Sequence, residues 1–108
     1  MKAIVLLDPF AVPFRHDELT AATMPVLLFR PDQSQLPGER NAIGLVTELP
    51  TPPGFHVVPG RHFVFTDVCE PALRLKDSEV CLDPAGVHRD AVHTDIEAYI
   101  VTLFRAIL

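Results

Sequence analysis

The sequence predicts a small α/β fold in which about three parallel strands are flanked by helices, with a long helix at the carboxyl end. Two features predict it. Short apolar runs recur without the alternation of a half-exposed strand, which is typical of strands buried on both faces of a parallel sheet. Segments with the apolar spacing of an amphipathic helix separate and follow these runs, as in a three-layer α/β sandwich. We expect one domain over residues 1–108, because the chain is short and shows no linker or internal repeat.

Three strands are expected, each an apolar run that stops at a turn containing proline: residues 3–7, 25–29 and 55–58. A parallel sheet of three strands has two open edges, and this chain supplies few helices to cover its faces. The predicted sheet is therefore part of a larger one. We expect it to be completed either by a second copy, in a homodimer or larger homo-oligomer, or by a companion chain.

The clearest helix is expected over residues 89–107, where apolar residues recur every three or four positions along one face. A second helix is expected over residues 39–49 and is ended by Pro50. Residues 17–23 are a weaker candidate for a short helix, and residues 72–75 are a candidate for a single helical turn.

Composition and charge argue against several classes of protein. A formal net charge of −5, from 9 basic and 14 acidic residues, does not favour a nucleic-acid partner. No apolar run approaches the roughly 20 residues that span a bilayer, so we expect no membrane association. The amino terminus lacks the long apolar stretch of a signal peptide, so we expect a cytoplasmic location for the chain as written. A periplasmic or secreted location becomes the expectation if a further segment precedes it.

No cofactor or metal is expected from the spacing of potential ligands. His88 and His93 are five residues apart, whereas a helical zinc pair prefers a spacing of four, so we expect a solvated helix surface there. Cys69 and Cys81 fit neither a zinc pattern nor a Cys-x-x-Cys redox motif. Two free, packed thiols are the first interpretation of these cysteines. A disulfide, which requires an oxidising compartment, is the alternative.

Three titratable residues follow the predicted strands: Asp8, Asp32 and His62. The carboxyl ends of parallel strands meet at one edge of a sheet, where catalytic residues gather. An acid can orient an imidazole there, and the imidazole can then remove a proton from a nucleophile. On chemistry alone, the alternative is that Asp8 belongs to an ordinary Asp-Pro turn and His62 to a packed loop.

Three segments, residues 4–14, 25–37 and 49–63, together with the segments around the two cysteines, make nearly the whole chain resemble the carboxyl-terminal part of an α/β-hydrolase. Residues 4–14, Ile-Val-Leu-Leu-Asp-Pro-Phe-Ala-Val-Pro-Phe, resemble the strand that carries the catalytic acid in platelet-activating-factor acetylhydrolase-like esterases and their dienelactone-hydrolase-like relatives. Residues 25–37 resemble the next strand and its loop. The most specific match is residues 49–63, which end in Pro-Gly-Arg-His-Phe and resemble the final strand with its catalytic-histidine loop. The segments around Cys69 and Cys81 resemble a cysteine-bearing excursion before the last helix.

The resemblance implies a serine hydrolase with a Ser-His-Asp triad, in which Asp8 corresponds to the acid and His62 to the base. It then places both on the same sheet edge, where a carboxylate oxygen within about 3 Å of an imidazole nitrogen would fix the tautomer. Two departures bear on this. The Pro-Gly-x-Gly-His-Phe form of the family is one residue shorter here. In many α/β-hydrolases the acid follows the second of these strands, at a position closer to Ser34, so Asp32 is kept as the reserve acid.

A third departure concerns the nucleophile. The Gly-x-Ser-x-Gly elbow is absent, and the two serines of the chain, Ser34 and Ser78, do not stand in such a setting. We therefore expect a hydrolase-derived domain without catalysis of its own, a truncated pseudoenzyme with a structural or oligomerising role. The alternative is half of an acyl-ester (carboxylic ester) hydrolase, in which Asp8 and His62 complete a triad whose serine lies on another chain.

Overall fold

A computed structural model describes residues 2–11, 18–76 and 78–108. It contains an open sheet of three parallel strands in the order β1-β2-β3. The strands are β1 (Ile4–Leu7), β2 (Val26–Pro31) and β3 (Gly54–Val58). The prediction of three parallel strands is confirmed, with boundaries within two residues of those expected.

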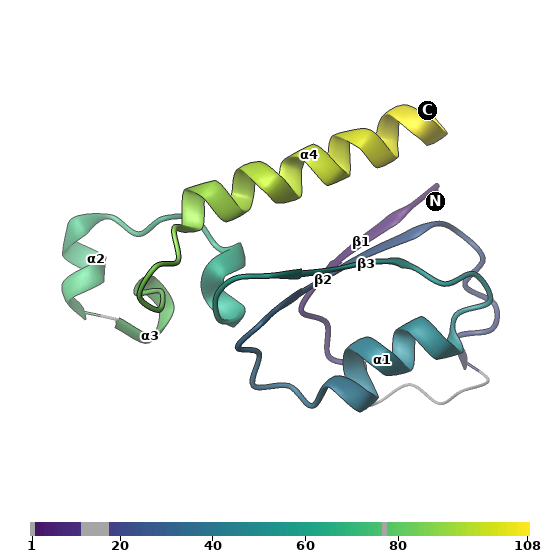
Figure 1. Cartoon of the computed structure of the whole chain (residues 1–108), viewed down its shortest axis with the longest axis horizontal. Coiled ribbons are helices and arrows are strands. Elements are labelled where there is room, and N and C mark those ends of the chain that lie inside the picture. Colours follow the sequence, from purple (N-terminus) through teal and green to yellow (C-terminus); the bar gives the residue numbers. More distant parts are fainter. Residues whose placement is uncertain (1, 12–17, 77) are drawn as a thin grey trace.

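One helix covers each face of the sheet (Figure 1). Helix α1 (Gly38–Glu48) lies on one side, within one residue of the expected bounds. The long helix α4 (Arg89–Ile107) lies on the other side, and its bounds are those expected from the sequence. Between β3 and α4 the chain forms a short 3₁₀ turn, η2 (His62–Phe65), and two short helices, α2 (Pro71–Lys76) and α3 (Ser78–Cys81). None of the helices in the described part of the chain is long and apolar enough to cross a membrane.

The central strand, β2, is buried on both faces of the sheet, which explains its continuous apolar sequence. Successive side chains of β2 point to opposite faces, so both sets are buried. Leu28 packs into the core beneath α1, together with Ala42 and Leu45. Phe29 packs into the core beneath α4, together with Val92. β1 and β3 are the edges of the sheet, and β3 is the more exposed of the two.

Two expectations about helices need correction. The predicted short helix over 17–23 begins outside the described residues. Glu18 is in a 3₁₀ turn, residues 19–21 form a bend and a turn, and residues 22–23 have no regular structure. The single turn predicted over 72–75 lies within a longer helix, α2. A second short helix, α3, follows it, so the two helices occupy most of the segment between the cysteines.

The cysteines form a disulfide, so the first interpretation of two free thiols was wrong. Cys69 and Cys81 are joined with a Cα–Cα distance of 5.6 Å, which closes a loop around α2 and α3. The short helices within this loop contain a single buried residue, Cys81 itself, among those described. A loop with so small an apolar core gains stability from a covalent closure, by about 3 kcal/mol for this length.

Candidate active site

The site begins with Asp8, which ends β1 in a left-handed backbone conformation. Its φ is 48°, a value that aspartate tolerates better than most residues. The Asp8 backbone N–H donates to the carbonyl oxygen of Phe29 at 2.8 Å, so the turn remains attached to β2. This position buries the Asp8 side chain at the carboxyl edge of the sheet.

His62 contacts Asp8 directly. Its Nδ1 atom lies 2.7 Å from Asp8 Oδ2, with 51% of the imidazole exposed and 1% of the carboxylate. A carboxylate accepts, so Nδ1 carries the hydrogen and Nε2 of the neutral ring is left as an acceptor. The juxtaposition implied by the resemblance is therefore present despite the shortened loop. The catalytic roles of the two residues stay a prediction.

A third side chain, that of Ser34 in the loop after β2, also contacts Asp8. The hydroxyl of Ser34 donates to Asp8 Oδ1 at 2.8 Å and lies 3.1 Å from Oδ2. The backbone N–H of Leu36 donates to Ser34 Oγ at 3.1 Å. Nearby, Arg30 donates from Nη2 to the carbonyl oxygen of Leu36, while its Nη1 lies 3.9 Å from Asp8 Oδ1.

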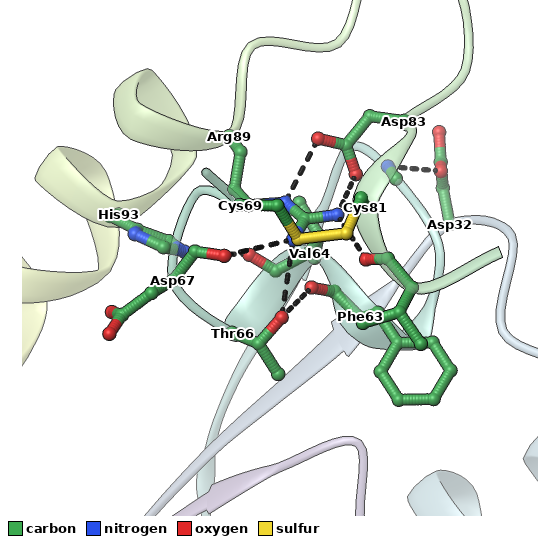
Figure 2. A network of polar contacts seen from close by, with 12 residues as sticks. Asp32, Phe63, Val64, Thr66, Asp67, Cys69, Cys81, Asp83, Arg89 and His93 are labelled. Atoms are coloured by element: carbon green, nitrogen blue, oxygen red, sulfur yellow. Dashed lines mark hydrogen bonds and ion pairs between the residues drawn. A yellow bond between two sulfur atoms is a disulfide. The ribbon is translucent and has the colours of Figure 1, made fainter. Parts of the chain in front are cut away.

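Asp32, the reserve acid, does not bind His62 in the described structure. Its carboxylate accepts from the backbone N–H of Gly60 at 2.9 Å, as Figure 2 shows. Gly60 has a φ of 120°, and a Cβ atom there would lie 2.9 Å from Val64 Cγ2, so glycine is required. Asp32 therefore stabilises the turn that leads into His62, and the structure pairs Asp8 with the imidazole.

A buried arginine fixes the chain beyond η2 (Figure 2). Arg89, the first residue of α4, forms a bidentate pair with Asp83 at 3.0 and 2.9 Å. The same guanidinium donates to the hydroxyl of Thr66, the carbonyl of Asp67 and the carbonyl of Val80. This network joins α3, α4 and the segment that follows η2, so it holds the far end of the loop bearing His62.

The two histidines near the start of α4 differ from the expectation of a solvated surface. His88 is exposed at the amino end of the helix, but His93 is half-buried, and its Nε2 lies 2.6 Å from the carbonyl oxygen of Val64. His93 thus donates to η2 and supports the loop of His62 from α4. Within the described residues, no group of three or more potential ligands could hold a metal ion.

The open groove between β3 and α4 does not adjoin the Asp8–His62 pair. The groove has a volume of about 620 Å³, and His56 stacks on Tyr99 there at a ring-centroid distance of 3.9 Å. Beside His62 there is a cavity of about 40 Å³, lined in part by Gln35 and Glu79. It is far below the few hundred Å³ typical of a ligand pocket, so this chain provides no enclosed acyl pocket at His62 within its described residues.

Comparisons of the chain with protein-family models, curated proteins and solved structures found no significant match. Membership of the α/β-hydrolase family therefore stays a prediction from the sequence resemblance.

Proposed function

We propose that this chain supplies the acid and histidine of an acyl-ester hydrolase whose serine lies outside these 108 residues. The observation that carries the proposal is the 2.7 Å contact between Asp8 Oδ2 and His62 Nδ1. A buried carboxylate that orients a half-exposed imidazole at the carboxyl edge of a parallel sheet is the arrangement that a Ser-His-Asp triad requires.

Each residue has a definite role in this proposal. Asp8 holds the imidazole of His62 in the tautomer that carries hydrogen on Nδ1. The free Nε2 accepts the proton of a serine hydroxyl as the serine oxygen attacks the ester carbonyl. His62 then gives this proton to the departing alcohol, which leaves an acyl-serine. Water repeats the same proton transfers and releases the carboxylic acid.

The described serines do not fill the nucleophile's place. Ser34 donates its only hydroxyl hydrogen to Asp8, on the acid side of the pair. Ser78 begins α3 rather than following a strand. An external serine following a strand parallel to β1 would reach the same sheet edge. The open edge of β1 suits such a strand, because Leu7 at the end of β1 is an exposed apolar residue that lines a cavity with Ile96 of α4.

The test uses the tagged chain purified from cells that naturally express it, treated with a fluorophosphonate probe that labels activated serines. We expect the isolated chain to be unlabelled and not to hydrolyse p-nitrophenyl esters above background. A co-purifying polypeptide, or a further segment of the same one, should be labelled in the wild-type complex. Labelling should be lost with His62→Ala, and kept with the matched control His88→Ala. Labelling that is unchanged in His62→Ala, or the absence of any labelled serine in the wild-type complex, would contradict the proposal.

A second candidate, a homo-oligomerising role without catalysis, is favoured by the opposite edge of the sheet. The carbonyl of Val58 accepts from the backbone N–H of Asp32, the residue just after β2. Because backbone groups alternate along a strand, those of Phe55 and Val57 face the open edge of β3. The side chain of Val57 is also 59% exposed. No described strand pairs with this edge, which also carries exposed apolar side chains.

The sequence around this edge is symmetric in a way that suits a second copy. Pro53 and Pro59 are equally distant from His56, so an antiparallel pair centred on His56 places the prolines at its two ends. Phe55 then lies opposite Val57 of the second copy. The N–H and C=O groups of these two residues on one strand form hydrogen bonds with the same groups on the other strand. Pairing of this kind would join two three-stranded sheets into one.

We expect His56→Cys to form an intermolecular disulfide readily under mild oxidation, because residues facing each other at such a two-fold axis have Cα atoms about 4.5–5.5 Å apart. Thr94→Cys, exposed on α4, is the control and should not cross-link efficiently. Light scattering should give a dimer or larger species at micromolar concentration. A monomer without cross-linking at position 56 would exclude this role and leave the triad proposal in place.

A further inference from the structure

We propose that Ser34 is a positioning residue that fixes the Asp8 carboxylate in the orientation needed by His62. This inference rests on the proposed function, because it matters only if Asp8 and His62 act as a catalytic pair. Ser34 belongs to the loop after β2, whereas Asp8 follows β1 and His62 follows β3. The contacts of Asp8 with Ser34 and His62 therefore join the ends of all three strands.

The hydrogen bonds of Ser34 determine the direction in which its hydroxyl hydrogen points. A serine hydroxyl has one hydrogen to donate, and its oxygen accepts from the Leu36 N–H at 3.1 Å. The hydrogen is thus directed to Asp8, where Oδ1 lies at 2.8 Å. Oδ2, which is farther from the serine oxygen at 3.1 Å, lies 2.7 Å from Nδ1 of His62. The backbone of the loop after β2 in this way determines which carboxylate oxygen faces the imidazole.

Burial makes this hydrogen bond hard to replace. The Asp8 side chain is 1% exposed, so water has little access to Oδ1 if the serine hydroxyl is removed. Another donor is Nη1 of Arg30, which lies 3.9 Å from Oδ1 and has no hydrogen-bond partner among the described residues. Without Ser34, the carboxylate would therefore turn toward Arg30 and away from His62.

The test is nitrogen-15 NMR of the His62 imidazole in the isolated chain, which requires no partner polypeptide. In the wild-type chain we expect the neutral ring to carry hydrogen on Nδ1, with a slowly exchanging Hδ1 proton. In Ser34→Ala this proton should exchange on the order of tenfold faster, as expected for the loss of one hydrogen bond to a charged group. The tautomer population should also shift toward hydrogen on Nε2.

Three further variants make the result specific. Ser34→Thr keeps the hydroxyl and should restore the slow exchange, whereas Asp8→Ala marks the complete loss of the contact. Ser78→Ala removes the other serine and should leave the imidazole signals unchanged. If Ser34→Ala does not fold, Ser34→Cys takes its place. Because a thiol is a weak donor, the His62 Hδ1 proton should again exchange faster than in the wild-type chain, but by less than about tenfold. Wild-type exchange and tautomer in whichever of these two variants folds would overturn the inference.

The outcome is separable from that of the proposed function. Failure to find a labelled serine would count against the hydrolase triad but would not alter the imidazole signals. Conversely, unchanged signals in Ser34→Ala would refute the positioning role, while His62-dependent labelling would still support the triad.

Discussion

Arg89→Leu is expected to lower the free energy of unfolding by about 3–5 kcal/mol, which is a large share of the 5–15 kcal/mol typical of a domain. All five N–H groups of this guanidinium donate to protein acceptors, two of them to the carboxylate of Asp83. Leucine would leave that carboxylate, 12% exposed, without its partner, along with two backbone carbonyls. Urea unfolding followed by circular dichroism measures the change.

The matched control is Arg105→Leu, which removes an exposed arginine from the last turn of the same helix. Its effect should stay within about 0.5 kcal/mol, as for most surface substitutions. Arg89→Lys should lie between the two, because an ammonium retains the charge but cannot reproduce the bidentate pair. Equal stability of the two leucine variants would mean that the Arg89 network contributes little to folding.

The same network links stability to the candidate active site. Thr66 and Asp67, which Arg89 binds, directly follow η2, the turn that begins with His62. The turn Pro59-Gly60 enters η2 with the support of Asp32, and His93 binds the carbonyl of Val64 within η2. The loop bearing His62 is thus held at its entry, its middle and its exit, which suits an imidazole that must keep one orientation.

The sheet and α4 could be predicted because their signals are local. The apolar run of β2 is buried on both faces, and the apolar stripe of α4 faces the core that contains Phe29. The bounds of α1 were also close, since Pro50 stops any helix there. The segment between Cys69 and Cys81 could not be predicted in detail, because its short helices are exposed and depend on a disulfide rather than on an apolar pattern.

The site was predicted in part. Asp8 and His62 could be found because both follow strands of a parallel sheet, and such positions converge at one edge. Ser34 was missed as the partner of Asp8, although its place after β2 was the one available signal. The burial of Arg89 carried no signal in the sequence, because its partner Asp83 lies in an irregular segment whose path only the folded chain reveals. Asp32 was a reasonable reserve acid by position, but its carboxylate supports the Gly60 turn.

Phe29→Ala is expected to cost about 3–5 kcal/mol of stability, the usual effect of removing a buried phenylalanine. The side chain is 0% exposed and lies at the centre of the core beneath α4. Its ring stacks with His56 at a centroid distance of 5.5 Å and approaches Tyr99 at 6.0 Å, so its loss also removes the support of that pair. Thermal or urea unfolding, monitored by circular dichroism, gives the difference from the wild-type chain.

Phe10→Ala is the control for this substitution, since Phe10 follows the turn at Asp8 and is 59% exposed. It should change stability by less than about 0.5 kcal/mol. Phe29→Leu fills much of the cavity, and we expect it to be less destabilising than Phe29→Ala. The carbonyl of Phe29 also accepts a hydrogen bond from the backbone N–H of Asp8. A shift of β2 in the alanine variant should therefore displace Asp8 and accelerate exchange of the His62 Hδ1 proton. A Phe29→Ala chain as stable as Phe10→Ala would mean that α4 does not pack on the sheet through this ring.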